Sequence, residues 1–183
     1  MDEFLQSKCA QQMREYRLPR FSELPRIEIY LDQLITVLHQ TLSPLFDDET
    51  SQCITASMIN NYAKQSVIQR PIKKRYTREH IAYLIFIALS KQVLSIDGIR
   101  KLIQIQLETY PLDIAYDYFC TEMEHALHTV FSTSDFPADS ATVQTQQTKL
   151  VRADVSAIAH KIYLAKFLEQ LAMQQEVSEN EQV

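Results

Sequence analysis

The chain has 183 residues, a net charge of −5 and a hydrophobic content of 46%, which suits one soluble domain, or one domain with a helical extension. It has a single glycine, Gly98, which excludes glycine-rich phosphate loops and dinucleotide-binding fingerprints because both need several glycines. The three cysteines, Cys9, Cys53 and Cys120, form no CxxC pair, so reduced thiols in the cytoplasm are expected rather than a disulfide framework.

The N-terminal region is predicted to contain one weak helix and one strong helix. Residues 1–17 indicate a short polar helix, and two prolines mark residues 18–25 as a linker because proline blocks helix continuation. Residues 26–45 have apolar side chains at spacings of three and four, which is typical of an amphipathic helix. The stripe consists of Ile27, Tyr30, Leu31, Leu34, Ile35, Leu38, Leu42 and Leu45. The acidic segment 46–53 is predicted to be a loop.

The next predicted helix presents two different faces. Thr55 is a suitable N-cap, and the helix is expected to end near Gln65 with Met58, Ile59 and Tyr62 facing inward. The opposite face would carry short polar or basic side chains, namely Ser57, Asn60, Asn61 and Lys64. Pro71 disfavours helix at Arg70, so residues 67–76 are predicted to be extended.

The rest of the chain is predicted to be helical. Thr77 and Ser95 are expected to cap helices that end near Gln92 and Glu108, and Pro111 is expected to begin a helix to Phe131. The apolar run 81–89 is too short to span a bilayer. A polar loop covers 132–145, and a last helix runs from about residue 148 to 174, before a polar tail at 176–183 that we expect to fray. The expected divisions are an N-terminal helix at 1–17, a core at 18–108 and a C-terminal helical region at 109–175.

The most distinctive segment is a basic one. The chain has no Asp or Glu from Thr50 to Arg78, yet six of its 18 basic residues fall there: Lys64, Arg70, Lys73, Lys74, Arg75 and Arg78. Asn can read adenine through two hydrogen bonds, and Lys or Arg can hold phosphates. The segment therefore predicts a DNA-binding helix followed by a basic wing. The alternative interpretation is a solvated polar face followed by a solvated charge run.

Three other groups of residues are candidates for chemical sites. Glu122 and His125 are three apart, with Glu124 and His128 beside them, but a metal site in a helical bundle needs further ligands on facing helices, so an exposed helix face is favoured. Cys53 and Cys120 have no His adjacent in sequence, which favours structural thiols. His39 and His80 are expected to be partly exposed. We therefore expect no enzyme activity, no metal and no cofactor.

The segment 58–103 resembles the DNA-binding part of MerR-type regulators, in which a recognition helix ends in a tyrosine and an extended wing leads into further helices. The matching positions are Tyr62, Tyr76, Thr77, Ile81, Leu84, Ile87, Leu94, Ser95 and Ile99. With the motifs LPRIEIYLDQ, MINNYAK and KKRYTREHI, residues 18–107 more closely resemble a bacterial family of uncharacterised helical proteins. The sequence departs from the MerR pattern at Asn60 and Asn61, where an arginine is usual, and at Ser66, where a glycine is usual.

The resemblance implies an all-α fold, with a winged helix-turn-helix-like core and a C-terminal helical extension. It implies a cytoplasmic bacterial transcription regulator that binds double-stranded DNA and dimerises through its C-terminal helices, with no membrane contact. For the last helix, packing within the chain is the alternative to dimerisation. For the whole protein, the alternative is a non-enzymatic interaction or structural module that has lost contact with DNA.

Overall fold

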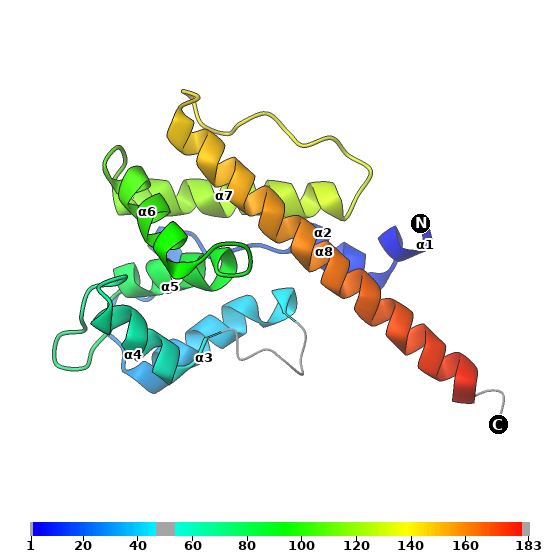
Figure 1. Cartoon of the computed structure of the whole chain (residues 1–183), viewed down its shortest axis with the longest axis horizontal. Helices are drawn as coiled ribbons and strands as arrows, with labels where there is room; N and C mark the ends of the chain where they lie inside the picture. The colour runs from blue at the N-terminus through cyan, green and yellow to red at the C-terminus, as the bar shows by residue number, and fades with distance from the viewer. Residues whose placement is uncertain (1, 47–53, 181–183) are drawn as a thin grey trace.

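The structure, a computed structural model, describes residues 2–46 and 54–180. Within these ranges the chain forms eight α-helices and two 3₁₀ turns and has no strand, which confirms the predicted all-α class (Figure 1). The elements are α1 (Asp2–Leu5), α2 (Lys8–Glu15), η1 (Phe21–Glu23), α3 (Leu31–Leu42), η2 (Ser43–Leu45), α4 (Ala56–Lys64), α5 (Arg78–Ser90), α6 (Ile96–Leu107), α7 (Leu112–Val130) and α8 (Gln146–Asn180). Most of the loop predicted at 46–53, including Cys53, lies outside the described residues.

Helix α5 occupies the centre of the core. Its side chains from His80 to Ala82 and from Ile87 to Ser90 are buried, as are Leu84 and Ile85. A helix that is apolar on nearly every side must be surrounded by protein or lipid, and here α3, α7 and α8 pack around it. The apolar run 81–89 is thus a core helix. No helix in the described part of the chain is both long enough and apolar enough to cross a membrane.

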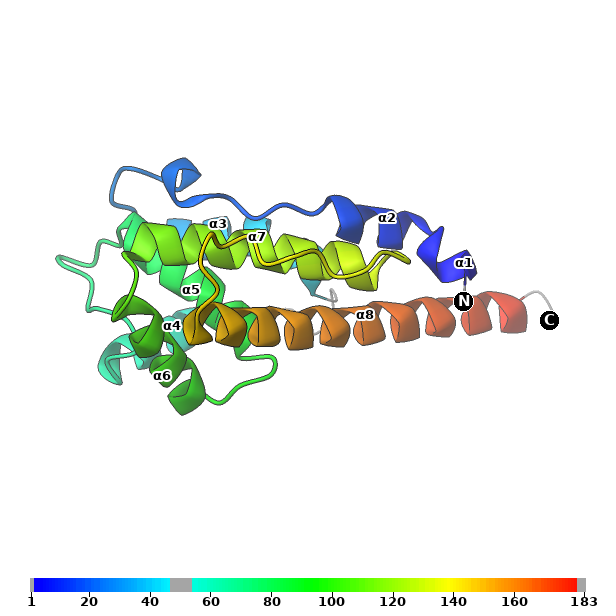
Figure 2. The ribbon, with the colours of Figure 1, turned by 90° about the horizontal axis from the view of Figure 1, so that it is seen from above.

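Among the described elements, helices α7 and α8 pack against each other most extensively. The connection between them returns along α7, so both helices run in the same sense (Figures 1 and 2). Glu122 of α7 holds this connection, because its buried carboxylate accepts a hydrogen bond from the Ser140 backbone N–H at 3.0 Å and pairs with Arg152 of α8. The prediction that Glu122 lies on an exposed helix face is therefore wrong.

The N-terminal helices pack against the core. Phe4 of α1 and Met13 of α2 are buried, and the Phe4 ring contacts Tyr163 and Phe167 of α8 at centroid distances of 5.4 and 5.0 Å. Arg20, in the segment after α2, forms a two-pronged ion pair with Glu124 of α7, with N–O distances of 2.6 and 2.7 Å. The N-terminal segment is thus attached to α7 and α8 rather than projecting from the domain.

Helix α3 is shorter than the predicted helix at 26–45. It begins at Leu31, and the exposed fractions of Ile27 and Tyr30 are 74% and 50%, so neither belongs to the buried stripe. Instead, Ile29 and Tyr76 exchange two backbone hydrogen bonds of 2.9 and 2.8 Å. A helix through residues 26–30 would have to break this pairing, which explains why the apolar periodicity overestimates the helix.

The predicted C-terminal helix is longer than expected. Helix α8 continues to Asn180 and extends beyond the other helices at its C-terminal end (Figure 2). Val151, Val155, Ile158 and Ile162 are buried, whereas Leu164, Leu168 and Leu171 are exposed. Leu164, Leu168 and Leu171 thus form an apolar group that the described part of the chain leaves partly exposed.

Candidate nucleic-acid interface

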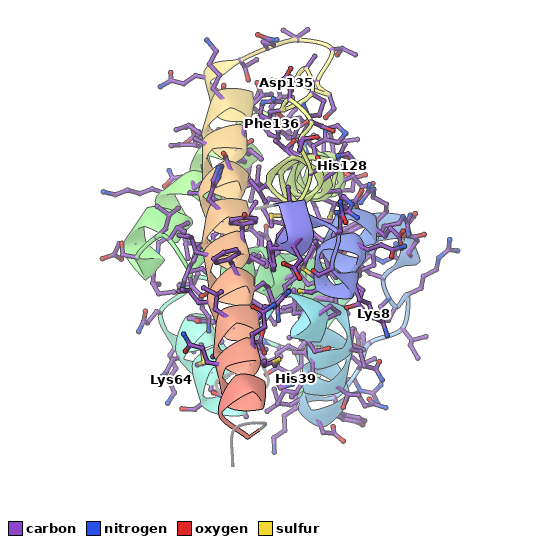
Figure 3. The ribbon with its side chains drawn as sticks, turned by 90° about the vertical axis from the view of Figure 1, so that its right-hand side faces the viewer. Lys8, His39, Lys64, His128, Asp135 and Phe136 are labelled. Carbon is purple, nitrogen blue, oxygen red and sulfur yellow. The ribbon has the colours of Figure 1, made fainter. Side chains whose placement is uncertain are left out.

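Helix α4 presents the polar face that the sequence predicts. The Thr55 side chain accepts a 3.2 Å hydrogen bond from the Met58 backbone N–H and so caps the helix as expected. Ile59 and Tyr62 are buried and Met58 is partly buried. The opposite face is exposed and consists of Ser57, Asn60, Asn61 and Lys64. Figure 3 shows Lys64 pointing away from the body of the protein.

The end of α4 depends on an unusual backbone conformation at Ser66. Its φ angle is 56°, in the left-handed region where glycine is favoured. The N–H groups of Ser66 and Val67 return to the carbonyl oxygens of Ala63 and Tyr62 at 3.3 and 2.9 Å. Glycine is favoured in this conformation because it has no Cβ atom, and here a serine adopts it.

A tight two-residue turn follows, with Lys73 and Lys74 at its tip. Their φ angles are 50° and 61°, and the Arg75 backbone N–H donates a 2.9 Å hydrogen bond to the Ile72 carbonyl. Two successive positive φ angles define the type I′ turn of a short hairpin, for which Asn-Gly is the preferred sequence. Both lysines are exposed. The predicted extended wing is thus a compact basic turn closed by one β-bridge.

Two arginines near the turn lie over aromatic rings. The Arg75 guanidinium lies 5.1 Å from the centre of the Tyr30 ring, and the Arg78 guanidinium lies 5.4 Å from the centre of the Phe21 ring. Such contacts hold a cation in place while leaving its N–H groups able to bind anions. Arg75 is exposed and Arg78 is half-buried, so the rings restrict both side chains at the protein surface.

His80 anchors the segment between α4 and α5. It is buried, so the prediction of a partly exposed residue is wrong. Its Nδ1 accepts a 3.0 Å hydrogen bond from the Thr77 N–H, and its Nε2 lies 3.1 Å from the Gln69 carbonyl oxygen. These partners require the neutral ring to carry its proton on Nε2. Burial lowers the pKa of His80, although the Gln69 contact opposes this effect.

Arg100 of α6 is a basic residue near this surface that the sequence did not single out. It donates a hydrogen bond of 3.3 Å to the Gln65 carbonyl at the end of α4 and pairs with Asp97 at 3.1 Å. The neighbouring Lys101 is also exposed. Arg100 lies outside the acid-free segment, so only its tertiary contact with Gln65 reveals this proximity.

The nine predicted binding residues are therefore displayed at one end of the molecule. Eight are exposed and Arg78 is half-buried. The loop that carries the basic turn extends outward at the α4 end (Figures 1 and 2). Their role in binding remains a prediction.

A family comparison covers this same region. The family described as Domain of unknown function (DUF1836) matches residues 19–119, which is more than half of the chain. The chain belongs to this family. No curated protein and no solved structure matches it. The DUF1836 match begins at Pro19 and ends at Phe119 in α7, so it includes all nine predicted binding residues and leaves α8 outside.

The other candidate sites in this DUF1836 protein are occupied by structural contacts. In the described parts of the chain, no group of three or more His, Cys, Asp or Glu residues could hold a metal ion. Glu122 and Glu124 pair with Arg152 and Arg20. Burial raises the pKa of the Cys120 thiol to about 12, so this cysteine is protonated at neutral pH and is a poor nucleophile.

Proposed function

We propose that this DUF1836 protein is a cytoplasmic bacterial transcription regulator that binds double-stranded DNA. In this proposal the core is winged helix-turn-helix-like, with α3 as the first helix, α4 as the recognition helix and the Lys73–Lys74 turn as a short wing. The supporting observation is the exposed set on α4 and the turn, within a segment that lacks acidic residues.

The chemistry of the side chains suggests which residues contact the bases and which contact the phosphates. Asn60 and Asn61 project from an exposed helix face, and an α-helix fits the major groove, where Asn pairs with adenine. Lys73, Lys74 and Arg75 bind phosphates, which fixes the protein on the duplex without reading its sequence. The protein is acidic overall, so electrostatic attraction to DNA must come from this local patch.

We propose further that the protein acts as a homodimer through α8. Leu164, Leu168 and Leu171 follow one another at spacings of four and three and are exposed, which matches the apolar seam of a short coiled coil. An unsupported helix end is marginally stable in water, and a second copy would bury these leucines. A two-fold dimer would read a palindromic site.

The decisive experiment is a selection from a random duplex library with the full chain. A palindromic sequence should be enriched, and binding should weaken as salt concentration rises. The variant Leu168→Glu should shift the solution mass from dimer to monomer and weaken binding to the palindrome. A library that yields no enriched sequence, together with the absence of salt-sensitive binding to bulk DNA, would refute the proposal.

A second candidate function is a non-enzymatic protein-interaction module. The observation that favours it is the exposure of Ile27, Tyr30 and Ile72 beside the basic turn, with 75% of Ile72 exposed. Apolar and aromatic side chains of this kind are enriched in protein interfaces. This candidate becomes the leading one if the duplex selection fails while Ile72→Ser leaves folding intact and increases solubility.

A further inference from the structure

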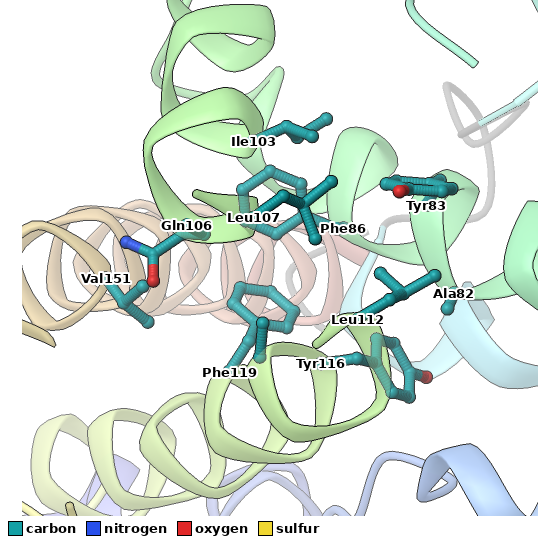
Figure 4. Close-up of a pocket in the computed structure, with 11 residues that line it drawn as sticks. Ala82, Tyr83, Phe86, Ile103, Gln106, Leu107, Leu112, Tyr116, Phe119 and Val151 are labelled. Carbon is teal, nitrogen blue, oxygen red and sulfur yellow. The ribbon is translucent and has the colours of Figure 1, made fainter. Parts of the chain in front are cut away.

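An apolar cavity lies where α5, α6, α7 and α8 meet. Its volume is about 40 Å³. Figure 4 shows Phe86 and Phe119 on facing helices, and their ring centroids are 5.0 Å apart. Leu107, Leu112 and Val151 also line the cavity. A cavity of roughly 150 Å³ is needed to hold benzene, so this one is limited to a short alkyl group.

A larger groove adjoins the cavity. It has a volume of about 530 Å³ and lies between α6, α7 and residues 140–143 of the connection to α8. Gln106 and Ala115 line both the cavity and the groove, so the two hollows have a wall in common. This volume lies within the usual range for small-molecule sites, so the groove can accommodate a small molecule.

The polar groups of the groove disfavour an anionic ligand. Among the described residues that line it, Asp117 is the one charged side chain, and no Lys, Arg or His contributes. A phosphate or carboxylate would therefore meet a carboxylate without a compensating cation. The hydroxyls of Tyr110 and Thr142 also line the groove and can donate or accept hydrogen bonds.

Gln106 places a polar group at the junction of the two hollows. Its side chain is buried, and its amide nitrogen donates a 2.9 Å hydrogen bond to the Gln147 carbonyl. That bond fixes the amide and leaves the oxygen as an acceptor. A complementary ligand has a hydrogen-bond donor near its apolar end.

We infer that this combined site binds a small amphipathic molecule that carries no anionic group. Its short alkyl end enters the cavity beside Phe86 and Phe119, and its hydroxylated end lies in the groove near Tyr110 and Thr142. Apolar burial supplies the attraction, and the polar contacts fix the orientation.

The site is connected to the candidate DNA interface through α6, an inference that rests on the proposed function. One face of α6 supplies Ile103, Gln106 and Leu107 to the hollows. Arg100 of the same helix bonds to the last turn of α4 through the Gln65 carbonyl. A ligand that fixes α6 therefore changes the affinity of α4 for DNA only if it favours one position of α6.

The test uses n-butyl β-D-glucoside as a probe and the full chain. Two matched probes are methyl β-D-glucoside, which lacks the alkyl end, and butyl phosphate, which has an anionic head. Amide chemical shifts measured during titration should show saturable binding of butyl glucoside at residues of α6 and α7. Binding of each matched probe should be at least about five-fold weaker.

Variants locate the binding site. Ala115→Leu fills the shared wall and should weaken butyl glucoside at least about five-fold. Ala153→Leu, a matched change at an exposed position of α8, should leave the affinity unchanged. Thr142→Val removes one hydroxyl from an exposed loop position and provides a second test should Ala115→Leu perturb folding; about three-fold weaker binding is expected.

Several outcomes would overturn the inference: no saturable binding of butyl glucoside, equal binding of either matched probe, or unchanged affinity in both Ala115→Leu and Thr142→Val. The proposed function is judged separately from duplex binding by the ligand-free protein. Butyl glucoside binding without duplex binding would refute the DNA-binding proposal and leave the ligand site standing.

Discussion

Ser90 of α5 donates a 2.7 Å hydrogen bond to Oδ2 of Asp154 on α8, deep in the core. The other carboxylate oxygen, Oδ1, is buried and has no hydrogen-bond partner among the described residues. Burial raises the pKa of Asp154 from 3.8 to about 6, although the Ser90 hydrogen bond opposes the rise. The interior therefore favours the protonated form of this side chain.

The first prediction concerns stability above pH 4. The pKa of Asp154 is higher in the folded protein than in the unfolded chain. The protonated side chain therefore stabilises the fold fully below pH 3.8, and this stabilisation is lost as the pH rises through about 6. The shift in the pKa of Asp154 corresponds to ~3 kcal/mol of unfolding free energy. Asp154→Asn removes the ionisation, so its free energy of unfolding should change less between pH 4 and 7, as measured by urea denaturation. Ser90→Ala should steepen the dependence, and identical pH profiles for all three proteins would contradict the assignment.

The second prediction concerns His80, whose burial should make the protein more stable as the pH rises, the reverse of the effect of Asp154. Burial lowers its pKa below the ordinary value of 6.5, so stability is present above pH 6.5 and is lost as the pH falls below it. His80→Gln retains an acceptor for the Thr77 N–H at the start of α5. This variant should lose less stability than the wild type between pH 7 and 5. A titration of the His80 ring by NMR with a midpoint at or above 6.5 would contradict the prediction.

The third prediction tests the buried rings beside the candidate interface. Tyr62 and Tyr76 are 6% and 3% exposed, and replacement of either by Ala should cost ~3 kcal/mol of unfolding free energy because it leaves a cavity. Tyr30→Ala is the matched control: half of this residue is exposed, so its replacement should cost less, about 1 kcal/mol, including the loss of the Arg75 contact. Chemical denaturation of the three variants distinguishes the cases. A wild-type midpoint for Tyr62→Ala or Tyr76→Ala would mean that the ring does not contribute to the core.

The sequence predicted helices best where one periodic stripe and one cap agree. Thr55 and Ser95 cap their helices through hydrogen bonds to Met58 and Gly98, as their chemistry suggests. Periodicity failed at Ile27 and Tyr30 because the backbone of Ile29 pairs with that of Tyr76, a contact between segments far apart in sequence. The burial of Glu122 was equally hidden, since its partner Arg152 is 30 residues away.

In the candidate interface too, features set by one helix could be predicted, whereas contacts between distant segments could not. Exposure of Asn60, Asn61 and Lys64 could be predicted from the inward spacing of Ile59 and Tyr62 on a single helix. The proximity of Arg100 to Gln65, and the position of Arg75 over Tyr30, depend on tertiary packing that leaves no local signal. A type I′ turn at Lys73 and Lys74 was also unpredictable, because its usual Asn-Gly sequence is absent.

The fourth prediction separates the geometry of the turn from its charge. Lys73 and Lys74 both adopt positive φ angles, which cost side-chain-bearing residues more than Asn or Gly. The double change Lys73→Asn and Lys74→Gly should therefore raise the free energy of unfolding by about 1 kcal/mol. The same variant should bind duplex DNA more weakly, since it loses two cations. A destabilised variant would show that the turn has a different conformation in solution.

The last prediction tests whether the turn binds phosphates. Lys73→Ala combined with Lys74→Ala should weaken duplex binding and should reduce the slope of log K against log salt concentration by about 2, roughly one for each lost phosphate contact. The control combines Lys8→Ala with Lys149→Ala, which removes the same charge at two exposed positions outside the candidate interface. That control should retain the wild-type slope, because long-range attraction between exposed charges is screened beyond about 10 Å at 0.1 M salt. Fluorescence anisotropy with a labelled duplex at several salt concentrations gives both slopes. Equal losses in the two double variants would mean that overall charge, rather than the turn, governs binding to DNA.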